Sequence, residues 1–233
     1  MTWTRVARAL LLVACAACAA CAAAPRQRVD RPDQLPARTY AVPADVGRLV
    51  VDAQAFADFA RPVRAGLEDD LARYDIRHAE SLTERLFILA VLDALDGRWT
   101  DAVARLDRIA AVENKPAARL MTGLTIRLWA DALARGGDTP QAFRAALERK
   151  LAALPVDEVR AQLEVLRAMG RAFTPDVCRR LIDENLGAEA RAGAISLESV
   201  HAVAFQRYAV VRLVPVGREI DEALAAAGIG LPD

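Results

Sequence analysis

The sequence predicts an all-α protein built from antiparallel helical hairpins. Apolar residues recur at helical spacing in successive segments from Asp45 onward, a pattern typical of helices with one buried face. Helix caps and glycine stops separate many of these segments, and no persuasive two-residue alternation of the kind that indicates a strand interrupts them. Much of the 54% hydrophobic content is alanine, the residue with the highest helix propensity.

The clearest hairpin begins at Ser81. Ser81 and Glu84 have the spacing of a capping box, which predicts the start of a helix. The almost wholly apolar run 86–92 predicts that this helix is central and covered on several sides. Gly97 provides a left-handed stop, and a second helix begins near Thr100. Because so few residues separate the two helices, they must fold back antiparallel.

This hairpin resembles a tetratricopeptide repeat, a unit of about 34 residues in which a glycine turn joins two helices. The resemblance covers residues 84–116 and rests on packing positions, namely Leu86, Leu89, Ala90, Gly97, Trp99, Ala102, Leu106 and Ile109. Asp93 departs from the pattern where an aromatic residue is usual, and Asn114 departs where a proline is usual. The resemblance implies a right-handed array of helix pairs with a concave surface for peptides or proteins. An irregular helical bundle is the alternative architecture.

A second hairpin follows at Pro116. Gly136-Gly137 ends its first helix, and Asp138 with Pro140 starts the next one. Gly123 lies inside the first helix, where glycine is unfavourable by up to about 1 kcal/mol relative to alanine. A close contact with another helix is the expected reason for this glycine.

The same helical spacing continues on both sides of these hairpins. Residues 45–74 predict at least one helix and favour two, with a break or kink at Arg61-Pro62. The run 210–214 is the only rival for a strand, and its upstream context is helical. Later boundaries are predicted at Gly170, Thr174, Gly187, Ser196, Pro215 and Gly228.

Residues 1–24 have the features of an export signal. Arg5 and Arg8 supply its positive start, and the remainder is apolar or small. The segment Leu12-Val13-Ala14-Cys15 resembles the lipobox of bacterial lipoproteins. The resemblance implies that Cys15 is lipidated and becomes the first residue of the mature protein.

Two alternatives to lipidation at Cys15 remain open at this stage. Cys21 and Cys18 give an apolar core of better length, although cysteine replaces leucine three residues before each of them. An ordinary secretory signal cut after Ala24 is the other alternative, which Pro25 disfavours because signal peptidases resist proline there.

Residues 25–44 are expected to form a proline-rich tether. Prolines interrupt the segment among arginine, glutamine and aspartate, a composition typical of an extended and partly stiff linker. The tether would hold an all-helical domain, residues 45–233, away from a membrane surface. The predicted location is therefore the bacterial cell envelope, lipid-anchored and facing the periplasm, with the outer membrane favoured.

No catalytic, cofactor-binding or metal-binding residue is predicted. The formal net charge is zero, whereas a nucleic-acid-binding protein should show a basic surplus. His78 and His201 have no second metal ligand at a suitable spacing, so a solvated turn and a packed helix are their expected settings. Cys178 stands beside arginines that could lower its thiol pKa, but a small buried residue is the favoured interpretation.

These features favour an envelope lipoprotein that binds protein partners of unknown identity as an interaction or assembly scaffold, without catalysis. The runner-up is a non-catalytic accessory module. It rests on residues 74–123, which resemble helical N-terminal regions of exported proteins with a subtilisin-like domain. An enzyme that uses His201 or Cys178 is the least favoured of the three hypotheses.

Overall fold

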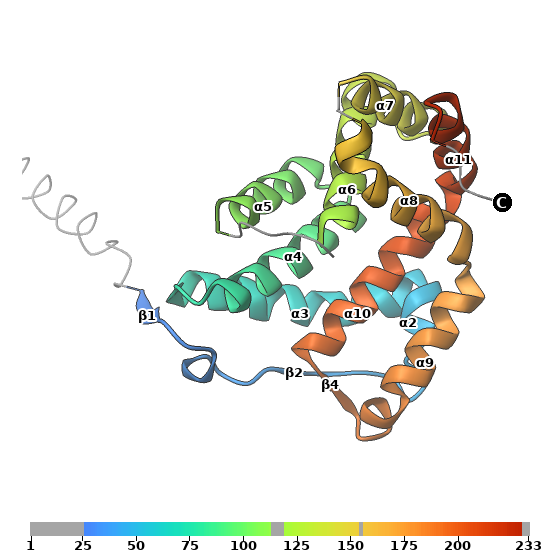
Figure 1. Cartoon of the computed structure of the whole chain (residues 1–233). Helices are drawn as coiled ribbons and strands as arrows, with labels where there is room; N and C mark the ends of the chain where they lie inside the picture. The colour runs from blue at the N-terminus through green and yellow to red at the C-terminus, as the bar shows by residue number, and fades with distance from the viewer. Residues whose placement is uncertain (1–25, 113–118, 154–155, 230–233) are drawn as a thin grey trace, which may run out of the picture.

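The computed structural model describes residues 26–112, 119–153 and 156–229, and it confirms an all-α fold. The helices are α2 (Arg48–Val51), α3 (Ala53–Arg73), α4 (Ala79–Leu95), α5 (Trp99–Val112), α6 (Arg119–Arg135), α7 (Pro140–Ala152), α8 (Val156–Ala172), α9 (Pro175–Arg191), α10 (Leu197–Tyr208) and α11 (Gly217–Ala226). Strands are limited, over the described ranges, to β1 (Gln27–Val29), β2 (Thr39–Ala41), β3 (Tyr74–Ile76) and β4 (Ala194–Ser196). Figure 1 shows these elements in their arrangement.

Helix α4 is the centre of the larger core. Every residue from Arg85 to Ala94 is buried, as the apolar run predicts. Helix α5 packs against it as the second half of an antiparallel hairpin, and α3 and α10 also contact α4. Gly97 has a φ of 75° in the turn between α4 and α5, so the predicted left-handed stop is confirmed.

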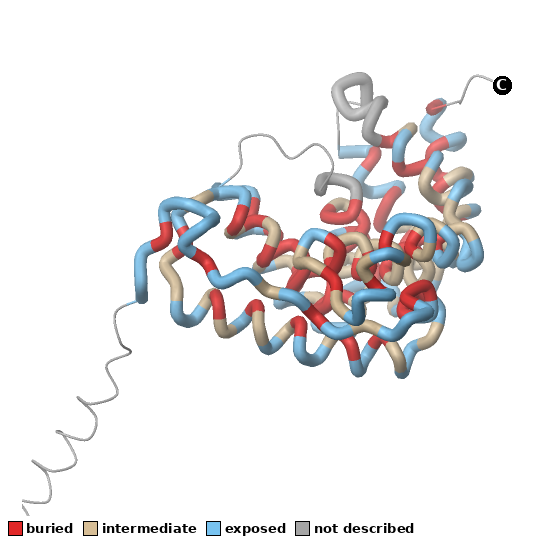
Figure 2. The backbone as a smooth tube through the Cα atoms, turned by 90° about the horizontal axis from the view of Figure 1, so that it is seen from below, coloured by how far each residue is buried: buried red, intermediate tan, exposed pale blue. Residues whose placement is uncertain are grey.

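A second core lies among α6, α7, α8 and α11. Trp129, Phe143, Leu147 and Leu224 are buried within it. Trp99 and Met169 touch both cores, so the two are joined by side-chain packing. Figure 2 shows the buried residues gathered where the helices face one another.

The helices do not stack in simple chain order. Helix α10 packs on α4 and on α2, and α9 also packs on α2, although these partners are far apart in the sequence. In a regular solenoid each repeat contacts only its neighbours. The contacts therefore favour an irregular bundle that contains helical hairpins.

Three predicted helix boundaries are wrong. The capping box at Ser81 is not the start of α4, because His78 is the N-cap and its side chain accepts from the Ser81 N–H. Helix α3 continues through Pro62, and the break falls earlier, at Asp52. Helix α9 continues through Gly187 to Arg191.

Other boundaries agree with the sequence. Thr174 and Ser196 are the N-caps of α9 and α10, and each side chain accepts a backbone N–H. Pro140 opens α7, although Thr139 and not Asp138 is its N-cap. The predicted opening of the second hairpin at Pro116 lies outside the described residues. The run 210–214, the only rival for a strand, lies in a π-helical turn at Ala209–Leu213 and the 3₁₀ turn that follows.

Residues 26–44 pair with the helical domain and do not form the extended, partly stiff tether expected for 25–44. Strand β1 pairs in parallel with β3, and β2 pairs antiparallel with β4. Val29 and Tyr40 are buried, and Arg38 donates from Nε to the Asp70 carboxylate at 2.9 Å. Residues 26–44 therefore form a strap on the helical domain, and we use that name below.

Candidate functional site

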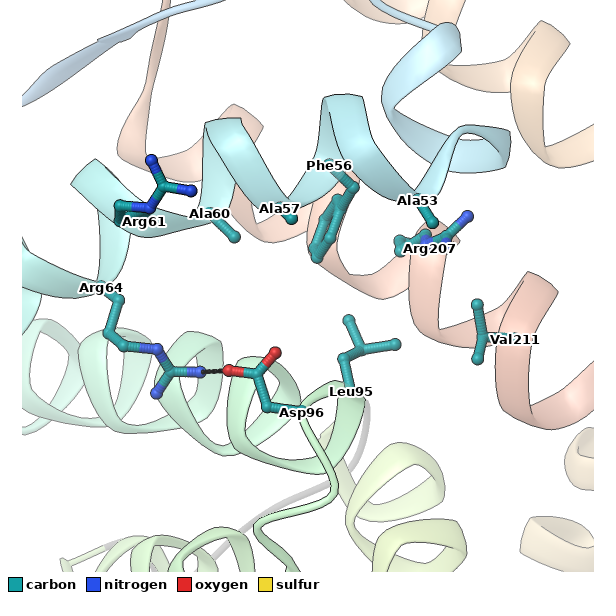
Figure 3. A pocket seen from close by; sticks show the side chains of 10 residues that line it. All are labelled: Ala53, Phe56, Ala57, Ala60, Arg61, Arg64, Leu95, Asp96, Arg207 and Val211. Carbon is teal, nitrogen blue, oxygen red and sulfur yellow. Dashed lines mark hydrogen bonds and ion pairs between the residues drawn. The ribbon is translucent and has the colours of Figure 1, made fainter.

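A groove lies between α3, the C-terminal end of α4, and the α10–π-helix segment. Its volume is about 390 Å³, within the range of small ligand sites. Its lining residues are Ala53, Phe56, Ala57, Ala60, Arg61, Arg64, Leu95, Asp96, Arg207 and Val211. We call it the α3 groove, and Figure 3 shows Phe56 and Leu95 projecting into it from opposite sides.

The amphipathic pattern of α3 explains the hollow. Val63 and Leu67 bury the inner face of the helix. The lining alanines recur at positions 53, 57 and 60, a helical spacing that places them along one stripe. Because an alanine side chain ends at Cβ, this stripe leaves space that Leu95 and Val211 border but do not fill.

Three arginines line the α3 groove, and two of them are already ion-paired. Arg61 donates to Asp58 at 3.2 Å on the exposed surface. Arg64 donates to Asp96 from Nη2 at 2.6 Å and also contacts Asp93. The groove therefore joins an apolar surface to a charged wall.

Arg207 is the third of these arginines and differs from the other two. Its Nη1 donates to the carbonyl oxygen of Val50 at 2.8 Å, and its guanidinium carbon lies 5.7 Å from the Phe56 ring centre. Burial lowers the pKa of Arg207, while the charge of Asp52 acts in the opposite direction. Among the described residues no carboxylate lies within ion-pair distance of Arg207. Of the three lining arginines, Arg207 is the one without an ion pair to any carboxylate of the described residues.

Asp93 fixes the wall of the α3 groove. Its carboxylate is fully buried and is contacted by Arg64 of α3, by Arg98 at 2.5 Å and by Arg105 of α5 at 2.6 Å. Burial raises the pKa of the Asp93 carboxyl, whereas the Arg105 hydrogen bond and the charges of Arg105 and Arg64 lower it. Three cations around one buried carboxylate tie α3, α4 and α5 together. This ion-pair network explains why an aspartate, and not an aromatic residue, occupies position 93.

The other polar residues considered from sequence have structural settings. His78 caps α4, and His201 of α10 packs on the Phe87 ring with centroids 4.8 Å apart. Cys178 of α9 is buried, and burial raises the pKa of its thiol to about 11. None of these three residues lines the α3 groove. The lipidation candidates Cys15, Cys18 and Cys21 lie outside the described residues.

Trp99 and Trp129 form an aromatic pair within the packed core. Trp129 is buried, Trp99 is half-buried, and their ring centres lie 6.5 Å apart. Arg212 covers both rings at 4.9 and 5.2 Å and donates to Asp138 at 2.7 Å. The pair therefore supports the junction of the two cores.

The described residues contain neither a cluster of metal ligands nor a helix that could span a membrane. No group of three or more His, Cys, Asp or Glu side chains in the described part of the chain could hold a metal ion. Within the same residues, no helix is long and apolar enough to cross a bilayer. Comparison with protein-family models, curated proteins and solved structures finds no match to this chain.

Sequence reasoning does not identify the α3 groove. Its walls come from segments about 150 residues apart, and no local motif links Phe56 with Arg207. The alanine spacing on α3 is the one local signal, and it reads equally well as an ordinary solvent-facing stripe.

Proposed function

We propose that this chain is a lipid-anchored protein of the bacterial cell envelope that serves as a protein-interaction or assembly scaffold, without catalysis. The anchor rests on Arg5, Arg8 and the lipobox-like segment ending at Cys15. The helical domain would face the periplasm, and the outer membrane is the favoured membrane for the anchor.

The α3 groove is the observation that carries the contact function. Phe56, Leu95 and Val211 line one groove between three helical segments, and arginines line it beside them. Apolar side chains next to arginine are typical of the energetically important part of protein interfaces. The hydrogen bonds and ion pairs around the groove hold it in a preformed shape, which lowers the entropic cost of binding.

Metabolic labelling with a radioactive fatty acid tests the anchor. In a bacterial host, the protein should incorporate the label, and replacing Cys15, Cys18 and Cys21 together by serine should abolish incorporation. The three single serine variants then identify the lipidated residue. An unlabelled native protein at normal abundance would contradict the lipoprotein proposal.

Photo-crosslinking in cells tests the contact. A photoreactive amino acid at Ala57, which is exposed and lines the α3 groove, should give adducts of defined mass with another envelope protein. The matched control carries the same amino acid at Arg180, which is exposed on α9. The same adducts from both positions, or none from position 57, would argue against a scaffold that works through this groove.

A further inference from the structure

We propose that the α3 groove binds the C-terminal residue of a protein partner, with its carboxylate on Arg207 and its apolar side chain between Phe56 and Leu95. This inference rests on the proposed function, because it names the part of a protein partner that the groove takes. The unpaired charge of Arg207, the shape of the groove and its apolar surface together suit such a residue.

The guanidinium of Arg207 has more hydrogen-bond donors than the described residues use. A guanidinium has five N–H donors in a planar fork that matches a carboxylate. The structure shows one of them used, by the carbonyl oxygen of Val50 at 2.8 Å. Donors therefore remain for an anion, and a two-point contact with a carboxylate is the strongest use of that geometry.

The carboxylates of Asp52 and Asp96, which lie near the groove, are ion-paired with other arginines. The Asp52 carboxylate accepts from the N–H groups of Gln54 and Ala55 as the N-cap of α3, and it also pairs with Arg48 at 2.7 Å. On the opposite wall, Asp96 is paired with Arg64. One positive charge is thus left over in the groove, and a single carboxylate complements it.

The apolar lining of the α3 groove favours a ligand that carries an apolar side chain next to its carboxylate. Phe56, which is only 6% exposed, and Leu95 project into the groove from opposite sides, and Val211 also lines it (Figure 3). A volume of about 390 Å³ lies at the low end for ligand cavities. It suits a side chain and its adjoining backbone and is too small for the apolar face of a whole helix.

A chain terminus fits this combination better than an internal segment. The last residue of a polypeptide carries an apolar side chain and a carboxylate on the same Cα, as Phe56 and Arg207 require. The alanine stripe of α3, at 53, 57 and 60, leaves room for the extended backbone that precedes that residue. A free apolar carboxylic acid shares the same chemistry and is separated from the peptide by the test below.

The test measures binding of a fluorescent peptide that ends in Ala-Ala-Phe to the mature lipoprotein in mild detergent, by fluorescence anisotropy. The free acid should bind, and the C-terminal amide should bind about tenfold or more weakly, because the charge-assisted hydrogen bonds are lost. Hexanoate should compete only at much higher concentration, since it lacks the backbone. An amide that binds as well as the acid would overturn the proposal, and hexanoate competing at the peptide's own concentration would overturn a protein terminus as the occupant.

Variants assign the binding to the groove. Arg207→Gln should weaken binding of the free acid about tenfold or more, whereas Arg180→Gln on exposed α9 should leave it unchanged. Because Arg207 also holds Val50, Ala57→Glu provides a second variant that adds a negative charge at an exposed lining position and should weaken binding in the same direction. Unchanged binding in both groove variants would overturn the proposal.

Failure of this inference is distinguishable from failure of the proposed function. If position 57 still forms adducts in cells but the peptide with a free terminal acid does not bind, the scaffold proposal is retained. The proposal that the groove binds a C-terminal carboxylate is then rejected. If neither is seen, both proposals fail.

Discussion

Asp93 shows what a single residue can and cannot reveal in this sequence. It is identified from sequence as a departure from the repeat pattern, and the structure explains it as the centre of three arginines. Those arginines come from α3, the α4–α5 turn and α5. Their convergence depends on helix packing that the local sequence does not encode. An i,i+4 pair between Asp101 and Arg105 is the expectation from local spacing alone, whereas Arg105 donates to Asp93.

Asp93→Ala should destabilise the fold by about 3 kcal/mol, because it removes the buried anion on which the half-buried Arg64 and Arg105 converge. This is the lower end of the range for a buried pair, since Arg98 is 42% exposed and regains hydration. The measurement is urea unfolding followed by circular dichroism. Asp101→Ala is the control, because Asp101 is exposed on α5. Equal midpoints for the two variants would show that Asp93 does not hold the three helices.

Cys178 gives a pH-dependent prediction. Its folded pKa of about 11 lies above the ordinary thiol value because burial disfavours the thiolate. A raised pKa means that the folded state holds the proton more tightly, so this contribution to stability is present below about pH 8.5 and is lost towards pH 11. The stability difference between the native protein and Cys178→Ala should therefore shrink by about 3 kcal/mol over that interval. A difference that stays constant with pH would contradict the raised pKa.

At the scale of elements, local sequence predicts helices well where caps and glycines act alone. Gly97, Thr174 and Ser196 behave as expected because their effects are confined to one turn. It fails at Pro62 and Gly187, where burial outweighs local preference. Helix α3 continues because its inner face buries apolar residues on both sides of Pro62, and α9 likewise buries residues on both sides of Gly187.

Gly123 and Gly217 should respond in opposite ways to alanine. A Cβ at Gly123 would meet Leu106 at 3.6 Å, an ordinary contact, so Gly123→Ala should stabilise α6 by about 0.5–1 kcal/mol. A Cβ at Gly217 would lie 2.5 Å from the backbone oxygen of Gly170, so Gly217→Ala must push α8 and α11 apart and should destabilise the protein. The check is the melting temperature, expected to rise for the first variant and fall for the second. A fall for Gly123→Ala would show that the close contact expected from sequence is real.

At the scale of the whole molecule, sequence predicts the class but not the arrangement. Helical spacing is local, and it is sufficient for an all-α fold. The packing of α10 against α2 and α4, and with it the α3 groove, depends on contacts between distant segments. The strap is missed for the same reason, because a proline-rich composition describes how stiff a segment is and does not say what it rests on.

The strap pairs with two segments that are far apart in the sequence. Its β1 pairs with β3, which follows α3, and its β2 pairs with β4, which precedes α10. Arg38 fastens it to Asp70, a carboxylate that is fully buried and also accepts from Arg85 at 2.9 Å. Arg38→Ala should cost about 1–3 kcal/mol in urea unfolding, because Asp70 loses one of its two cations.

Hydrogen exchange then shows whether the whole strap depends on this contact. In Arg38→Ala the amides of β1 and β2 should lose protection, while those of α4 should keep theirs. Arg28→Ala is the control, since the Arg28 side chain is 72% exposed and its ion pair is with Asp30 of the strap itself. If Arg38→Ala matches this control in both stability and exchange, residues 26–44 behave in solution as the free tether that their composition predicts. If the amides of α4 open together with the strap, the strap belongs to the cooperative unit of the domain, and the helices then unfold together with residues 26–44.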